Sequence, residues 1–246
     1  MDPIELMDKT LVFRKPEDVI NAVETYGIVP FFRNRISGFS IEEHTPADLW
    51  FTEFPGPWEW KGAILRSGCY YGKFFENRAA YISAELFPDF ANFRRDGYDY
   101  DARMEDGLGD EQDYAILQTL GNYEGILSRA LKKKTGYFGK EGKSGFESRI
   151  TRLQMQGYVT IQDFEYDLDK HGKPYGWGVA RYTTPENSRG AEFTEKVYLR
   201  KPEESYAILF NKLKSVFPEE NDQTIDRFLN YKDRHLKKVP AGRILL

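Results

Sequence analysis

The fold class is decided by one stretch in the second half of the chain, where a helix pattern passes into a strand pattern. It reads Phe146-Glu147-Ser148-Arg149-Ile150-Thr151-Arg152-Leu153 and, after a short link, Tyr158-Val159-Thr160-Ile161-Gln162-Asp163-Phe164-Glu165-Tyr166. Phe146, Ile150 and Leu153 recur at intervals of four and three residues, which is the spacing of one helical face. Residues 158–166 alternate as a strand does, and residues 176–183 supply a partner strand. This stretch therefore predicts a helix followed by a β-hairpin.

Two further helix patterns precede this stretch. Residues 110–120 carry one apolar face. The apolar face of a second helix, which ends at Thr135 and Gly136, consists of Ile126, Leu127, Ala130 and Leu131. Three short helices followed by a hairpin is the element order of a winged helix-turn-helix unit. We expect the helices and the hairpin to share one core. Its predicted members are Leu117, Ile126, Leu127, Ala130, Ile150 and Leu153.

The first half of the chain mixes helix and strand patterns and is rich in aromatic residues. Residues 16–27 read as a helix, because Pro16 and two acidic residues mark its start and Gly27 its end. Residues 70–75 and 79–83 read as a hairpin. The acidic segment 94–113 is predicted to be a solvated loop between the two halves.

The predicted architecture is α+β. Two more helix patterns, near residues 203–217 and 222–232, close the chain. The predicted organisation is an aromatic-rich α+β region at residues 1–108, a winged-helix unit at residues 109–200 and C-terminal helices at residues 201–246.

Composition excludes several classes of protein. With 246 residues, of which 40% are hydrophobic, the chain is long enough to bury a core and is not a disordered tail. No apolar run is long enough to span a membrane, and the N-terminus does not resemble a signal peptide. Cys69 is the single cysteine, so we expect a cytoplasmic protein without disulfides. The three histidines and Cys69 lack metal-ligand spacing, and we expect neither a metal nor another cofactor.

The charge distribution is uneven. The whole chain has a net charge of −4, yet residues 129–152 hold eight basic and two acidic residues, while the remainder holds 27 basic and 37 acidic ones. Such a basic segment in an acidic chain indicates an anionic partner, and on a winged helix that partner is duplex DNA. The predicted phosphate contacts are Lys132, Lys133, Lys134, Lys140, Lys143, Arg149 and Arg152. The alternative is a solvated face on a non-catalytic winged helix that serves interaction or regulation.

The sequence resembles the bacterial AlkZ-related proteins over most of its length. The resemblance is carried by residues 56–61 (Gly-Pro-Trp-Glu-Trp-Lys), 71–75 (Tyr-Gly-Lys-Phe-Phe), 87–92 (Phe-Pro-Asp-Phe-Ala-Asn), 145–156, 158–159 and 175–182. This group is distantly similar to the AlkZ and YcaQ glycosylases, which are built from tandem winged helices, remove alkylated bases and unhook interstrand crosslinks. Those enzymes are longer and carry their catalytic motif near the N-terminus.

The resemblance implies a glycosylase-like protein that acts on alkylated bases. The catalytic signature of the enzymes is glutamine–apolar–glutamine, which Gln154-Met155-Gln156 matches, so Gln154 and Gln156 would orient a water and the target nucleotide. Asp163 or Glu165 would act as general base if either lay near that water, and the hairpin would wedge the duplex while a base is extruded. A further alternative is a small-molecule enzyme that uses the aromatic half as its pocket. The sequence leaves the oligomeric state open.

Overall fold

The computed structural model describes residue 7 and residues 10–51, 55–168, 170–171 and 174–230. Within these ranges the chain is an α+β protein with two small antiparallel sheets, which confirms the predicted class at this level. No helix in the described ranges combines the length and the apolar character that crossing a membrane requires.

The first half is built on a three-stranded sheet with flanking helices. Its elements are α1 (Pro16–Tyr26), β1 (Ile28–Pro30), α2 (Ile41–His44), a 3-10 turn (Ala47–Leu49), α3 (Pro57–Arg66), β2 (Tyr70–Phe75), β3 (Arg78–Ile82), α4 (Phe87–Arg95) and α5 (Tyr100–Glu105). β3 is the central strand, and Tyr81 on it lies opposite both Val29 of β1 and Tyr71 of β2. The helix predicted at residues 16–27 and the β2–β3 hairpin are confirmed.

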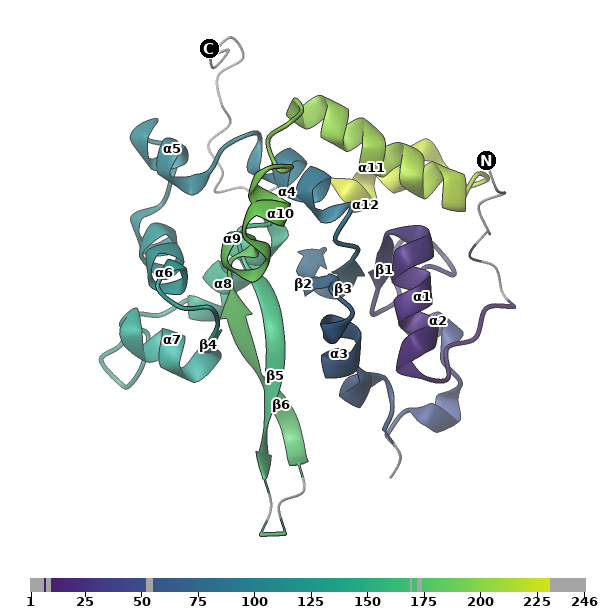
Figure 1. Ribbon diagram of the computed structural model, residues 1–246, viewed down its shortest axis with the longest axis horizontal. Coiled ribbons are helices and arrows are strands. Elements are labelled where there is room, and N and C mark those ends of the chain that lie inside the picture. Colours follow the sequence, from purple (N-terminus) through teal and green to yellow (C-terminus); the bar gives the residue numbers. More distant parts are fainter. Residues whose placement is uncertain (1–6, 8–9, 52–54, 169, 172–173, 231–246) are drawn as a thin grey trace.

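The second half holds the other sheet. Its elements are α6 (Glu111–Gly121), β4 (Ile126–Leu127), α7 (Ser128–Lys134), α8 (Phe146–Met155), β5 (Thr160–Leu168), β6 (Pro174–Thr183), α9 (Pro185–Arg189), α10 (Ala191–Thr194), α11 (Pro202–Val216) and α12 (Asp222–Leu229). The strand order is β4-β6-β5, and both pairings are antiparallel. The predicted hairpin is present as β5 and β6, a long ribbon that extends past the neighbouring helices (Figure 1). Residues 169 and 172–173, in the turn that joins them, lie outside the described residues.

Two local predictions are wrong. Ile126 and Leu127 do not begin a helix but form β4, because their backbones pair with Tyr182 and Arg181 of β6. α7 therefore begins at Ser128, later than predicted, so its side chains point in directions other than the predicted ones. As a result Ala130, a predicted core member, is exposed.

The acidic segment 94–113 is not a continuous loop. It contains α5 and the first turn of α6, because its carboxylates cap helices. The side chain of Asp99 accepts the backbone N–H of Ala102, and that of Asp110 accepts those of Gln112 and Asp113. The acidic residues thus start helices as well as face solvent.

The two halves meet along α8, β5 and β2. Thr160 on β5 donates its hydroxyl to the carbonyl of Tyr71 on β2 at 3.0 Å. Buried apolar side chains from all three predicted segments belong to one hydrophobic core. The segment boundaries after residues 108 and 200 stay a prediction.

Arg95 holds a second junction, between α4 and the chain that follows α8. Its guanidinium is fully buried and donates to the carbonyl of Gly157 at 2.7 Å, to the Glu186 carboxylate at 2.7 Å and to the Tyr198 hydroxyl at 2.8 Å. Gly157 has a φ of +77°, and a Cβ there would lie 3.0 Å from the Cα of Ala91. The close approach of α4 to this turn therefore requires glycine.

Candidate nucleic-acid interface

The exposed positive charge of the second half lies on α7 and the loop that connects it to α8. α7 ends in three consecutive lysines, a position where cations stabilise the negative end of a helix. We define the α7 basic face as the exposed cations of this region, which are Arg129, Lys133, Lys134, Lys140 and Lys143. The segment between them runs over the surface, so these ammonium and guanidinium groups can approach an anionic partner.

Two lysines of the α7 basic face make only weak contacts with neighbouring residues. The ammonium of Lys134 lies 5.2 Å from the ring centre of Tyr123, and that of Lys143 donates to the carbonyl of Thr135 at 3.3 Å. No member of the face makes an ion pair with any residue that the structure describes. Lys132, by contrast, is half-buried and pairs with Glu147 at 2.5 Å. The charge of the face is therefore available to phosphates, whereas that of Lys132 is largely compensated.

Arg149 and Arg152 of α8 are bound to α6 instead. Arg149 donates to Asp110 at 2.6 Å and to Asp113 at 2.7 Å, and the Nε of Arg152 donates to Asp113 at 2.9 Å. The side chain of Asp113 is only 2% exposed. Two arginines thus compensate one buried carboxylate. The predicted phosphate contacts therefore divide into exposed lysines of the α7 basic face and paired cations, which are Lys132 on α7 and Arg149 and Arg152 on α8.

Sequence reasoning missed this pairing of α6 with α8. Asp113 lies 36 positions before Arg149, and in the sequence it is one of many acidic residues. One signal in the sequence could have revealed this pairing. Asp110 lies at the start of a predicted helix, and Asp113 follows it three residues later. Cap positions place carboxylates at a defined edge of a helix, where a neighbouring helix can reach them.

Gln154 and Gln156 are both buried. Gln154 is 1% exposed, and its side chain accepts the N–H of Lys73 and donates to the carbonyl of Ile150, each at 3.0 Å. Gln156 is 3% exposed, and Met155 between them is buried as well. Gln154 therefore lies at the contact between α8 and β2, and Met155 and Gln156 are buried next to it in the chain.

The two candidate general bases are on β5 and face outward. Asp163 is exposed, and its carboxylate accepts the N–H of Phe164 at 2.8 Å. Glu165 pairs with Arg181 of β6 at 2.7 Å. The partners of these carboxylates are a backbone N–H on β5 and an arginine on β6, whereas those of Gln154 lie on β2 and α8, so the described contacts do not join the four residues into one site.

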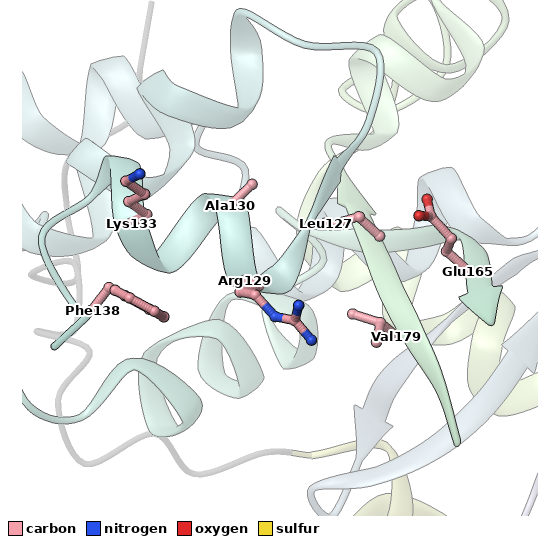
Figure 2. Close-up of a pocket in the computed structure, with 7 residues that line it drawn as sticks. All are labelled: Leu127, Arg129, Ala130, Lys133, Phe138, Glu165 and Val179. Carbon is pink, nitrogen blue, oxygen red and sulfur yellow. The ribbon is translucent and has the colours of Figure 1, made fainter. Parts of the chain in front are cut away.

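A cavity of about 380 Å³ adjoins the α7 basic face. It is lined by Leu127, Arg129, Ala130, Lys133, Phe138, Glu165 and Val179. Figure 2 shows the ring of Phe138 and the side chain of Val179 pointing toward each other across it, with Arg129 between them. Phe138 is 59% exposed, which is unusual for a phenylalanine. The sequence offered one signal for this cavity, an aromatic residue within a basic loop.

A second cavity, of about 440 Å³, lies in the aromatic half. Phe32, Trp50, Phe51 and Trp58 line it together with Arg33, Glu42, Glu43, Thr45 and Ala47. Most of the other aromatic side chains of this half belong to the buried core. Among the described residues no group of three or more histidine, cysteine, aspartate or glutamate side chains is placed to hold a metal ion.

The arrangement defines an α+β protein with an exposed cationic surface on its second half. A family model described as AlkZ related matches residues 13–230, so the chain belongs to the AlkZ-related family. No significant match is found among curated proteins or among solved structures.

Proposed function

We propose that the protein binds duplex DNA through a winged-helix unit formed by α6, β4, α7, α8, β5 and β6. The observation that carries the proposal is the α7 basic face, whose five cations are exposed and make no ion pair with the described residues. A duplex presents a dense row of phosphates, and neutralising them releases counterions, which favours binding. Membership of the AlkZ-related family supports the same partner.

The element order supports the winged-helix assignment. Helix, short strand, two helices and a hairpin follow one another, and the short strand pairs with the second strand of the hairpin. α6 packs against α7, α8 and β6, which supports grouping these helices and the sheet in one unit. In such units one helix and the wing face the duplex.

The contact surface differs from the common arrangement, in which the third helix enters the major groove. α8 packs against α6 and β2, and its arginines are paired with Asp110 and Asp113. We therefore assign the phosphate contacts to α7 and its loop, and give Arg149 and Arg152 the role of holding α8 in place. Contacts to phosphates do not distinguish one base from another, so we expect the affinity to be independent of the DNA sequence.

The test is fluorescence anisotropy with a labelled duplex over a series of salt concentrations. Affinity should fall with salt, and Lys133→Ala with Lys134→Ala should make the slope of log K against log salt shallower by about 2. The matched control is Lys201→Ala with Arg227→Ala, which removes the same charge from exposed positions outside the unit. Equal affinities for wild type and the α7 variant would overturn the proposal.

A second candidate function is removal of alkylated bases, which the family relationship and the match of Gln154-Met155-Gln156 support. An N7-alkylated purine is a cation with a weakened glycosidic bond, and neutral amides would suffice to place water beside it. The assay is release of N7-methylguanine from methylated duplex at stoichiometric excess of protein. Release no faster than the spontaneous background would remove this candidate for that substrate.

A further inference from the structure

The cavity beside the α7 basic face combines an exposed aromatic ring, an apolar wall and flanking cations. Phe138 forms one side, Leu127, Ala130 and Val179 form apolar surface, and Arg129 and Lys133 complete the rim (Figure 2). Its volume of about 380 Å³ lies in the range of about 300–1,000 Å³ that is typical of small-ligand sites. The cavity is thus large enough for a planar ring system.

Phe138 is not part of the hydrophobic core that the described residues form. Its side chain is 59% exposed in the loop after α7, although burying a phenylalanine is favourable. Tyr137, the preceding residue, is buried and stacks edge-on against Phe146 at 5.5 Å between ring centres. The loop is thereby anchored by Tyr137 while the next ring is presented to the cavity, as a stacking platform requires.

The charges around the cavity suit a phosphodiester chain. Arg129 and Lys133 line it, and neither makes an ion pair with the described part of the chain. The one acidic lining residue, Glu165, is already paired with Arg181 at 2.7 Å. A base that enters the cavity therefore leaves its flanking phosphates near cations and meets no uncompensated carboxylate.

We infer that this cavity receives an unpaired nucleobase, which stacks on Phe138 while Arg129 and Lys133 contact the adjoining phosphates. The inference deepens the proposed function and rests on it, because it assigns single-stranded or locally opened DNA to the same surface. An aromatic face with neighbouring cations is the arrangement by which proteins hold single strands, and stacking tolerates any base.

The test compares two labelled single strands of 20 residues, oligo-dT and an abasic strand with the same number of phosphates. Wild type should bind oligo-dT more tightly, by about 10-fold for one stacked base. Phe138→Ala should abolish the preference without changing the salt dependence, and Phe138→Trp should keep it. Phe51→Ala, at another exposed phenylalanine, is the matched control.

Each outcome has a distinct meaning. Equal, salt-dependent binding of both strands by wild type overturns the base site and leaves the proposed phosphate contacts intact. A preference that survives Phe138→Ala overturns the assignment to this cavity. Absence of binding to either strand and to duplex overturns the proposed function itself.

Discussion

The side-chain oxygen of Gln154 accepts the backbone N–H of Lys73 at 3.0 Å, and this hydrogen bond ties helix α8 to strand β2. The amide nitrogen of the same side chain donates to the carbonyl of Ile150. Both ends of the amide are thus occupied within a buried contact. The residue that matches the glycosylase signature is, in this structure, also a cross-link between the two halves of the fold.

Gln154→Ala should lower the free energy of unfolding by about 1–3 kcal/mol, because it removes the acceptor of the Lys73 N–H and leaves a void at a position that is 1% exposed. Urea denaturation measures the loss. Gln223→Ala, at an exposed position on α12, should change the stability by less than about 0.5 kcal/mol. If Gln154→Ala instead kept full stability and lost base release, the residue would have a catalytic and not a structural role.

Asp110 should contribute to stability in a pH-dependent manner. Burial alone would raise its pKa, but the N–H of Asp113 and the Arg149 guanidinium outweigh burial and hold the pKa below its ordinary value of 3.8. A carboxyl whose pKa is lower in the folded state stabilises the fold above its unfolded pKa. That contribution is lost as the pH falls through the lower, folded value.

Asp110→Asn isolates this effect, since asparagine still caps a helix. The stability difference between wild type and this variant should be constant above about pH 5 and should shrink below pH 3.8. Denaturation midpoints measured across this range provide the check. A difference independent of pH would show that the charge of Asp110 does not stabilise the fold.

Arg95→Met should destabilise the protein by about 2–4 kcal/mol, because it leaves the Gly157 carbonyl without its hydrogen-bond donor and Glu186 without its ion-pair partner. Arg95→Lys should recover little, since one ammonium cannot replace the planar fork that reaches three acceptors. Glu186→Gln keeps a hydrogen-bond acceptor and is the milder comparison. Equal losses for Arg95→Met and Glu186→Gln in urea would contradict the central role of the guanidinium.

Lys61 should make stability rise with pH in the alkaline range. Its ammonium lies 4.2 Å from the ring centre of Phe164, and burial lowers its pKa from 10.5 although Glu59 acts in the opposite direction. The folded state therefore releases this proton at a lower pH than the unfolded state does. Relative to Lys61→Met, wild type should gain stability as the pH rises toward 10.5. A parallel pH profile for the two proteins would contradict this expectation.

Local pattern predicted much of the second half, because amphipathic spacing and turn residues are encoded within a few positions. α8 and the β5–β6 hairpin follow directly from the period of their apolar residues. β4 could not be found in this way, since two residues carry no period and become a strand only by pairing with β6. The prediction of a loop for the acidic segment is wrong because a capping carboxylate looks the same in sequence as a solvated one.

The candidate site was only partly visible in the sequence for a similar reason. Clustering of lysines located the α7 basic face, since adjacent residues on one short helix stay together in space. Nothing local distinguishes Lys133 from Arg149, yet the first is exposed and the second is paired with Asp113 across two helices. The cavity that Phe138 lines is likewise formed with Val179 of β6, 41 positions later in the sequence, which no local pattern reveals.

The close approach at Gly157 also limits which amino acids the chain can accept there. A Cβ at position 157 would lie 3.0 Å from the Cα of Ala91, and any residue there must adopt a positive φ. A library that samples all twenty residues at this position should therefore yield glycine almost alone among well-folded clones. Ala91→Gly in the same library would not remove the steric demand, because the nearest atom is the Cα, which glycine keeps, so glycine should still dominate at position 157.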